Sequence, residues 1–251
     1  MRLVMSLKLI PSIGKSLTSL MCFFKFNGSL ISFSFLSLKR DIKASIESLY
    51  LICIVFCIVF FISKSIENIV IKLEKKDSIY FLNLAADENR WNTTFVREIS
   101  KVLDEIEKDE GPGALITSSE NPKFFSNGLD LDWMQEPKSN PDGGDRDVFG
   151  KEFMLLMGRF ITLPIPTVCA INGHAFGAGF MLALTHDVRI MREDRGFLCA
   201  NEMQLGLSIP RPELSLFKHK IPANAFYETV QLSKRWTGPD ALNAGIVQAI
   251  S

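Results

Sequence analysis

The chain has 251 residues, with 28 Lys and Arg against 28 Asp and Glu, so its formal net charge is zero and nothing in the charge suggests a nucleic-acid partner. A hydrophobic fraction of 47% with 22% charged residues is typical of a globular protein with a substantial core. The five cysteines form no CxxC pair and the three histidines do not cluster, which argues against a disulfide framework and a metal site and suits a reducing compartment.

Residues 1–65 differ in composition from the rest of the chain. They are rich in Ser, Phe, Leu, Ile and Lys, and the run Leu49–Ile62 carries no charge. Residues 44–63 contain one charge, Glu47, and approach the ~20 apolar residues that a membrane-spanning helix needs. Three interpretations are a membrane anchor, a cleaved signal peptide, and a segment foreign to the folded protein, such as translated non-coding sequence. We favour the third, because the sequence of residues 1–65 shows no pattern typical of a strand, a helix cap or a turn. We therefore expect residues 66–251 to fold alone.

From Ile66 onward the signals of secondary structure become regular. Residues 68–74 and 78–84 predict two strands joined by a tight polar turn. Asn92 and Thr93 predict the start of a helix that runs to about Lys108. One face of this helix is apolar, with a helical period, through Phe95, Val96, Ile99, Val102, Leu103 and Ile106.

Further elements follow the same alternation. Short buried strands are predicted at residues 113–119, 167–172 and 187–193. Helices are predicted at residues 148–163 and from the glycine stretch to about His186. A further helix, capped by Thr237, is predicted from Pro239 to Gly245. The polar loop at residues 136–147 is expected to be mobile. Alternating strands and helices predict an α/β fold with parallel strands.

Two glycine turns follow two of these buried strands. One contains Gly128, and the other contains Gly177 and Gly179 within "INGHAFGAGF" and opens a helix. N–H groups at a helix start lack partners within the helix, so two adjacent turns of this kind predict an oxyanion hole. Tight packing of helix on sheet is the alternative interpretation of either turn. A dinucleotide site fits worse, because the spacing is GxxxGxG rather than GxGxxG.

A resemblance to a known family is carried by "KFFSNGLDLDWM", "PTVCAINGHAFGAGFMLALTHDVRIMRED" and "RGFLCANEMQLGLSIP", with weaker support from "WTGPDALNAGIV". These stretches resemble the crotonase (enoyl-CoA hydratase/isomerase) superfamily, and within it the plant peroxisomal Δ3,Δ2-enoyl-CoA isomerases. The resemblance begins near Ile66. It implies a crotonase-like (ClpP/crotonase) spiral of ββα units that binds an acyl-CoA, with coenzyme A as part of the substrate and no separate cofactor or metal.

The resemblance also implies site residues. The oxyanion-hole donors would be the backbone N–H groups of Leu129 and Ala178. Asp130 is interpreted as either functional or structural, and we favour a structural hydrogen bond. The residues implied to bind the substrate or its CoA portion are Lys123, Phe125, Ser126, Asn127, Gly128, Asp130, Leu131, Gly177 and Gly179.

The acid–base groups favour one reaction. Hydratases of this superfamily use two carboxylates to activate a water, and Met181 occupies the first of these positions here. Glu202 occupies the second, and a single carboxylate suffices for an isomerase, which removes a proton at C2 and returns one at C4. Glu202 is therefore the expected catalytic base, with an exposed or capping glutamate as the alternative. His174 is expected to be hydrogen-bonded at the pocket wall rather than catalytic.

The carboxyl end departs from the family pattern. The chain stops at "AGIVQAIS", where related proteins continue with helices that cover the acyl-CoA and form trimers, and it lacks a final Ser-Lys-Leu signal. We therefore expect a C-terminally truncated domain with weak turnover, a homotrimer only where those helices are present, and a peroxisomal location by resemblance. Two rivals to the isomerase remain: a hydratase or acyl-CoA hydrolase, and a membrane-tethered, non-catalytic CoA-binding protein.

Overall fold

A computed structural model describes residues 4–11, 18–26, 29–36, 70–136 and 143–251, and the chain divides into two compact units, Met1–Ser65 and Ile66–Ser251. The described part of the first unit is an antiparallel sheet, formed by β1 (Val4–Pro11), β2 (Thr18–Phe26) and β3 (Ser29–Leu36). The expectation that no strand is present in this unit was wrong. Residues 32–35 alternate Ser and Phe with the two-residue period of a strand.

The expected membrane-spanning segment, residues 44–63, lies outside the described residues. Among the helices that the structure describes, none is long and apolar enough to cross a membrane. The expected mobile loop at residues 136–147 also falls in part on residues that are not described.

The second unit contains a six-stranded sheet with the order β12-β10-β8-β6-β5-β4. β4 (Ile71–Lys76) and β5 (Ile79–Leu84) form the predicted antiparallel hairpin, which turns at Asp77 with a φ of +54°. All other neighbouring pairs in the sheet are parallel. The remaining strands are β6 (Ala114–Ser119), β8 (Thr167–Ile171), β10 (Val188–Met191) and the unpredicted β12 (Ala249–Ile250).

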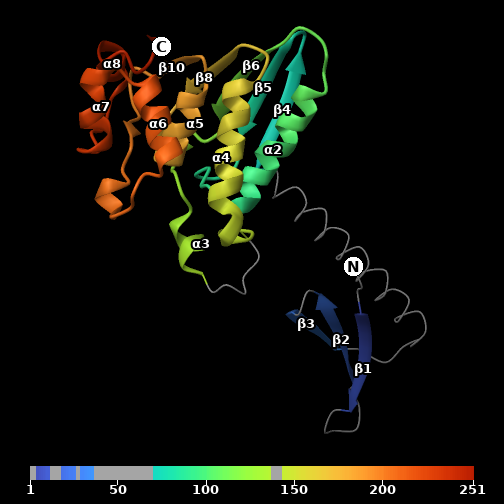
Figure 1. The fold of residues 1–251 in the computed structure, drawn as a ribbon. Coiled ribbons are helices and arrows are strands. Elements are labelled where there is room, and N and C mark those ends of the chain that lie inside the picture. The colour runs from blue at the N-terminus through green and yellow to red at the C-terminus, as the bar shows by residue number, and fades with distance from the viewer. Residues whose placement is uncertain (1–3, 12–17, 27–28, 37–69, 137–142) are drawn as a thin grey trace. The chain divides into compact units, whose positions relative to one another are not determined.

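The chain between these strands repeats the order strand, strand, helix. After β6, β8 and β10 it enters a second, parallel sheet formed by β7 (Phe124–Ser126), β9 (His174–Phe176) and β11 (Leu198–Cys199). The helices that follow are α3 (Leu131–Gln135), α4 (Arg146–Thr162), α5 (Ala178–Thr185), the 3-10 turn η1 (Met203–Leu205), α6 (Arg211–Lys220) and α7 (Ala223–Val230). This is the predicted spiral of ββα units (Figure 1).

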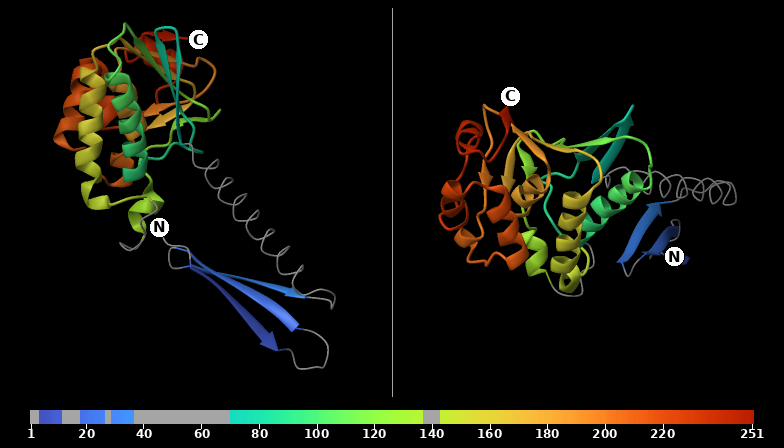
Figure 2. Two further views of the ribbon diagram at one scale, coloured as in Figure 1. Left: turned by 90° about the vertical axis from the view of Figure 1, so that its right-hand side faces the viewer. Right: turned by 45° about the horizontal axis from the view of Figure 1, so that its top comes forward.

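Helices α2 (Thr93–Glu107) and α4 lie side by side over one face of the six-stranded sheet (Figures 1 and 2). Asn92 caps α2 as predicted, because its side-chain oxygen accepts the N–H of Phe95 at 2.9 Å. Arg159 of α4 joins the two helices through ion pairs with Asp104 and Glu107. Near the carboxyl end, α8 (Gly238–Asn243) confirms the helix predicted from its Thr237 cap.

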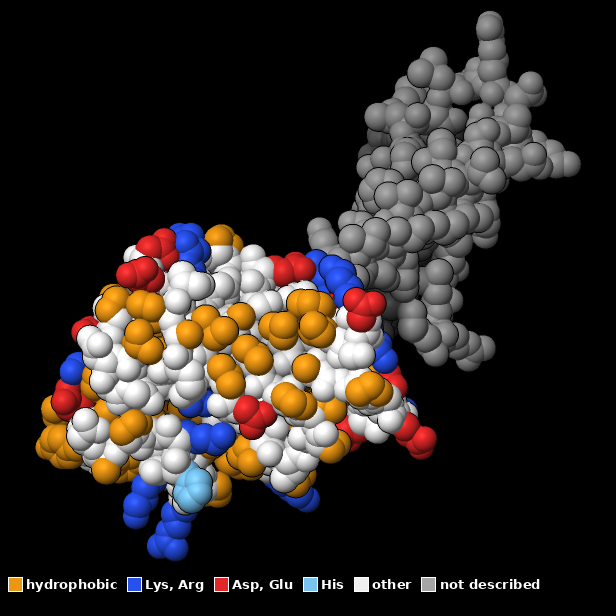
Figure 3. Space-filling model, turned by 90° about the horizontal axis from the view of Figure 1, so that it is seen from above, with side chains coloured by type: hydrophobic (Ala, Val, Ile, Leu, Met, Phe, Trp, Pro, Cys, Tyr) orange, Lys and Arg blue, Asp and Glu red, His pale blue; other side chains and the backbone are white. Residues whose placement is uncertain are grey.

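The two faces of the six-stranded sheet differ in burial. Alternate residues such as Leu82, Leu115 and Cys169 are fully buried beneath the helices. Their neighbours Phe81, Ile116 and Val168, which pair across three strands, are only partly buried. Seen from above, apolar side chains gather across one face of this unit with few charges among them (Figure 3).

Candidate active site

The two glycine turns lie against each other, because β7 pairs with β9. A Cβ atom built on Gly128, whose φ is +81°, would be 2.9 Å from the carbonyl oxygen of Phe176. A Cβ atom on Gly179 would be 2.6 Å from the Cβ of Ser126 and 2.8 Å from its backbone oxygen. Side chains do not fit at such distances, so both positions require glycine. The close approach of the two turns explains the density of small residues around residues 173–179.

Both turns carry backbone N–H groups that donate to no partner among the described residues. Ala178 is the first residue of α5, so its N–H lies at the positive end of the helix dipole without a partner in the helix. Leu129 forms an isolated bridge with Trp91, whose backbone donates to Gly128 at 2.8 Å and accepts from Asp130 at 2.9 Å. Neither the N–H of Leu129 nor that of Ala178 donates to any described residue. Two such donors on adjacent turns can form an oxyanion hole.

Glu202 follows β11 and lies beside the second turn. The N–H of Gly177 donates to the carbonyl oxygen of Cys199 at 2.9 Å, which holds this segment against the start of α5. Oε1 of Glu202 lies 3.0 Å from the position that a Cβ on Gly177 would take. Its Oε2 is buried and has no hydrogen-bond partner among the described residues. Burial raises the pKa of Glu202, opposed by a backbone hydrogen bond, and a raised pKa makes a carboxylate a stronger base.

Two further residues near this end of α5 differ in their chemistry. Met181 lies within α5, is 3% exposed and packs in the hydrophobic core. Glu213, which was not predicted from the sequence, lies in the first turn of α6. Burial, followed by the negative charge of Glu202, raises the pKa of Glu213 to about 7. The charge of Glu202 thus acts on a second carboxylate, and no motif in the sequence marks Glu213.

The residues expected along the first turn divide into an exposed one and two buried ones. Lys123 is exposed at the start of the turn. Phe125 and Ser126 are fully buried. The hydroxyl of Ser126 donates to the carbonyl oxygen of Asn89 at 2.7 Å and accepts from the indole N–H of Trp91 at 3.0 Å. Their side chains therefore support the turn from within the core.

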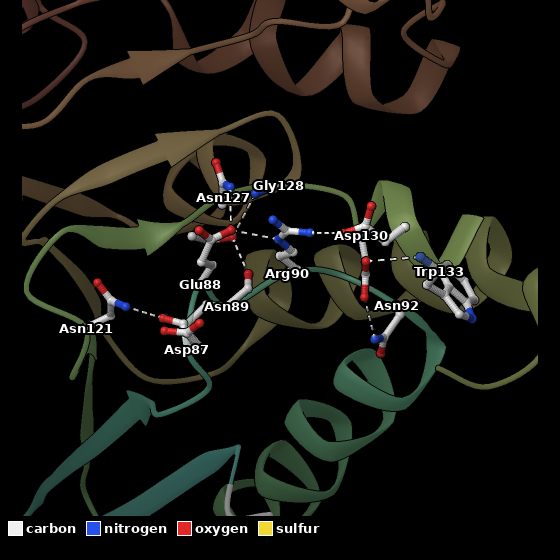
Figure 4. A network of polar contacts seen from close by, with 12 residues as sticks. Asp87, Glu88, Asn89, Arg90, Asn92, Asn121, Asn127, Gly128, Asp130 and Trp133 are labelled. Atoms are coloured by element: carbon white, nitrogen blue, oxygen red, sulfur yellow. Dashed lines mark hydrogen bonds and ion pairs between the residues drawn. The ribbon is translucent and has the colours of Figure 1, made fainter. Parts of the chain in front are cut away.

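Asp130 and Leu131 begin the helix that follows the first turn. Asp130 caps α3, because its side chain accepts the N–H of Trp133 at 3.2 Å, and it also accepts from Asn92 at 3.3 Å (Figure 4). Both contacts are structural and support the favoured interpretation of this residue. Leu131, the first residue of α3, is 36% exposed.

A polar network that was not predicted joins the loop after β5 to the first turn (Figure 4). The carboxylate of Glu88 accepts from Asn127 at 2.8 Å and from Arg90 at 2.7 Å, and both contacts lower the pKa of Glu88. Arg90 also donates to Asp132 at 2.6 Å. A pocket of about 420 Å³ opens here, lined by Val70, Ala86, Asp87, Glu88, Asn89, Arg90, Asn92, Thr94, Phe95 and Asp130.

The expectation that His174 is hydrogen-bonded was wrong, because its Nδ1 is buried without a partner among the described residues. Its ring instead stacks on those of Phe176 and Phe197, with centroids 5.4 Å and 5.3 Å apart. Burial lowers the pKa of His174, which favours the neutral ring. In the described part of the chain, no group of three or more His, Cys, Asp or Glu side chains is placed to hold a metal ion.

Known proteins resemble this chain in sequence and fold. The sequence profile of the Enoyl-CoA hydratase/isomerase family matches residues 74–251. The chain is 36% identical over 180 residues to enoyl-CoA delta isomerase 2, peroxisomal, of Arabidopsis thaliana, covering 70% of this chain and 75% of that protein. It is 35% identical over 181 residues to enoyl-CoA delta isomerase 1, peroxisomal, of the same plant, covering 70% and 73%. A crystal structure of a probable enoyl-CoA hydratase from Mycobacterium tuberculosis has the same fold, with a TM-score of 0.65 at 24% identity over 72% of this chain and 75% of that one.

Proposed function

Because this chain belongs to the enoyl-CoA hydratase/isomerase family, we propose that it is a Δ3,Δ2-enoyl-CoA isomerase of fatty-acid β-oxidation, which converts a 3-enoyl-CoA to a trans-2-enoyl-CoA. The observation that carries the proposal is the position of Glu202, whose Oε1 lies beside Gly177 and whose Oε2 is buried without a partner among the described residues, at the turn that presents the N–H of Ala178. Met181 supports it, since methionine takes no part in the water activation that hydratases need. The names of the two Arabidopsis relatives point the same way.

The proposed mechanism uses the carboxylate and the donors together. The thioester oxygen accepts hydrogen bonds from the N–H groups of Leu129 and Ala178. Glu202 removes a proton at C2, and the electron pair of that C–H bond enters a dienolate whose negative oxygen lies in the hole. The proton then returns at C4 and the double bond moves to C2–C3. In other enzymes the removal of one oxyanion-hole donor costs about 10²–10³ in kcat.

The substrate and its setting are proposed from the same comparison. Coenzyme A is part of the substrate, and no separate cofactor is proposed. The exposed Lys123 offers positive charge for its phosphates. Gly177 leaves space beside Oε1 of Glu202 for the acyl thioester, while Gly128 and Gly179 let the two turns pack closely. A peroxisomal location follows the names of the relatives, and a homotrimer is proposed where the family's C-terminal helices are present.

Hydration of a 2-enoyl-CoA is the second candidate reaction. It is favoured by one observation, a second partly buried carboxylate, Glu213, whose pKa is raised by burial and by the charge of Glu202. A hydratase needs two carboxylates on one water, whereas the isomerase needs one base on C2. The two reactions are therefore separated by the substrate that is consumed.

The test is turnover of 3-enoyl-CoA, followed by the absorbance of the conjugated product. Glu202→Gln keeps the shape of the side chain and removes its basicity, so kcat/KM should fall by ~10²–10⁴ while acyl-CoA affinity measured by calorimetry is retained. The matched control is Glu193→Gln, which removes the same charge from an exposed position after β10 and should leave the rate unchanged. Equal rates for Glu202→Gln and wild type would show that the base lies elsewhere. Faster water addition to 2-enoyl-CoA than isomerisation would favour the hydratase.

A further inference from the structure

Two short segments that follow residues of the candidate site expose apolar side chains. α3 begins two residues after Leu129, and η1 begins directly after Glu202. Of the twelve exposed large hydrophobic residues in the described part of the chain, five lie within residues 131–135 and 203–207: Leu131, Met134, Met203, Leu205 and Leu207. Single exposed apolar residues are normal on a protein surface, whereas a concentration of them marks a place where an apolar group binds.

The apolar side of α3 is fixed by contacts on its opposite side. Trp133 is 3% exposed, and its indole N–H donates to the carbonyl oxygen of Gly144 at 3.1 Å. Arg146 donates to the carbonyl oxygen of Met134 at 2.8 Å, which holds the end of the helix. Because residues three apart share one face of a helix, Leu131 and Met134 form a single exposed apolar strip.

The apolar residues after Glu202 are tied to it by backbone hydrogen bonds. The N–H groups of Leu205 and Leu207 both donate to the carbonyl oxygen of Glu202, at 3.0 Å and 2.9 Å. Gly206 allows this tight return with a φ of +70°. Met203, Leu205 and Leu207 are 52%, 47% and 41% exposed. An apolar segment is therefore held in a fixed place next to the expected base.

Both segments start close to Gly177. A Cβ built on Gly128 would be 3.8 Å from the backbone nitrogen of Gly177, and a Cβ built on Gly177 would be 3.0 Å from Oε1 of Glu202. Since consecutive Cα atoms are about 3.8 Å apart, Leu131 lies within about 12 Å of Gly128, and Met203 lies within about 4 Å of Glu202. In Figure 1 both segments lie at the lower edge of the second unit, α3 in yellow-green and η1 in orange.

We propose that α3 and residues 203–207 bind the alkyl tail of the acyl group, so that the protein prefers a long, unbranched acyl chain to a short one. This inference rests on the proposed function, in which the thioester oxygen lies between Leu129 and Ala178 and C2 lies beside Glu202. The tail continues from C4 away from the thioester. It therefore passes the segments that follow Leu129 and Glu202, where the exposed apolar side chains are concentrated.

The chemistry of the two segments suits an uncharged, flexible ligand. Asp132 is their only charged residue, and it pairs with Arg90 at 2.6 Å. Met134 and Met203 provide unbranched, polarizable side chains, which adapt to ligands of variable shape. Each methylene that leaves water gains about two- to fourfold in affinity, so a tail longer by six methylenes should bind on the order of 10²–10³ more tightly.

The first test measures binding and needs no turnover. Calorimetry on the full chain compares butanoyl-CoA with decanoyl-CoA, and wild type should bind decanoyl-CoA on the order of 10²–10³ more tightly. Met134→Gln and Leu205→Gln remove one apolar side chain from each segment, so each should lower this ratio by about three- to tenfold. The matched control is Leu155→Gln, which changes a leucine of α4 that is 60% exposed and should leave the ratio unchanged.

The outcomes of this test separate the tail site from the proposed function. Equal affinities for the two ligands, or unchanged ratios in Met134→Gln and Leu205→Gln, would overturn the tail site and leave the isomerase proposal intact. An altered sedimenting mass of these variants with an unchanged ratio would assign the segments to contact with a second copy of the chain. The expected ratios without isomerisation of any 3-enoyl-CoA would overturn the isomerase and keep the tail site. No acyl-CoA binding at all would overturn both.

The second test locates the tail. The full chain is labelled with ¹³C at its methionine methyl groups, and the resonances of Met134 and Met203 are assigned from Met134→Gln and Met203→Gln. Saturation with decanoyl-CoA should shift both resonances more than saturation with butanoyl-CoA does. Met191, which is buried in β10, is the control and should respond equally to the two ligands. Equal shifts of Met134 and Met203 with both ligands would place the tail elsewhere and overturn the proposal.

Discussion

Helix α5 has two unlike ends. At its N-terminal end the N–H of Ala178 has no partner among the described residues, and Oε2 of Glu202 is buried and unpartnered. At its C-terminal end His186 is fully buried with both ring nitrogens bound. Nδ1 lies 2.9 Å from the carbonyl oxygen of Leu182, and Nε2 lies 2.8 Å from the hydroxyl of Thr117.

The difference separates the requirements of stability from those of function. Buried polar groups are almost always hydrogen-bonded, because an unmade bond costs ~1–3 kcal/mol. The His186 end obeys this rule and contributes to the stability of the core. The Glu202 end does not, and folding alone would not favour it. Groups left without partners inside a site are available to a ligand, so the violation itself supports the proposed site.

The largest effect on folding stability is expected from lowering the pH, because His186 at the C-terminal end of α5 must then take up a proton. Burial lowers the pKa of His186 to about 4, whereas an unfolded histidine titrates near ~6.5. Between these values the unfolded chain binds a proton that the folded chain does not, so stability rises with pH and is lost as pH falls. The loss should approach ~3 kcal/mol by about pH 4.

Denaturant unfolding of wild type and His186→Gln across this range measures the effect. His186→Gln should lose its share of the acid dependence, at a cost near neutral pH of ~1–3 kcal/mol for disturbed hydrogen bonds. His219→Gln, which removes an exposed imidazole, is the control. If His186→Gln and wild type lose stability in parallel on acidification, His186 is not the titrating group.

A smaller loss of stability is expected for Gly179→Ala at the other end. The added Cβ would lie 2.6 Å from the Cβ of Ser126 and 2.8 Å from its backbone oxygen, so the turns must separate at a cost of ~1–3 kcal/mol. Gly150→Ala in α4 is the matched control. Its Cβ would have no atom within 4 Å, and helix propensity predicts a gain of ~0.5–1 kcal/mol. Melting of both variants measures the contrast, and equal stabilities would mean that the turns are not tightly packed.

Met181→Leu should cost less than ~1.5 kcal/mol, because the two side chains have similar volumes and Met181 lies in the core. The rate of isomerisation should not change, since the thioether transfers no proton. Unfolding and turnover measured on the same preparation test both statements. A large fall in rate without a fall in stability would place Met181 in the chemistry at the Glu202 end.

The smallest effect is expected from removing residues 1–65. Both ends of α5 and every member of the described core lie in the unit Ile66–Ser251. We expect residues 66–251 alone to unfold with the same midpoint as the full chain, measured by circular dichroism. Loss of folding on this deletion would mean that the boundary at residue 66 is wrong.

Much of the fold was predictable because its signals are local. The β4–β5 hairpin, the Asn92 cap of α2 and the Thr237 cap of α8 each depend on a few neighbouring residues. The strands β7, β9 and β11 were not predicted, because two or three residues carry too little periodicity. They exist because the spiral places them side by side, where each completes the hydrogen bonds of its neighbour.

The candidate site divides in the same way. Glu202 and the glycine turns are marked by motifs, and the motifs predicted residues that the fold brings together. Glu213 and the Glu88–Arg90 network have no local signature. Phe125 and Ser126 were implied to bind the substrate, and their side chains are buried beneath the turn. Adjacency along the chain did not reveal which side chains of a turn face inward.

The sequence by itself determined the positions of the longer strands and several helices of residues 66–251, which positions must lack a Cβ, and which carboxylate follows the family motif. These properties depend on the conformational limits of single residues and on periodicity over a few turns. Only the tertiary structure decided that Gly128 meets Phe176 and that Glu202 faces Gly177. Only the tertiary structure, too, decided that the charge of Glu202 acts on Glu213. The reason is physical: burial and the loss of a counter-charge arise only when segments distant in the chain pack together and exclude water.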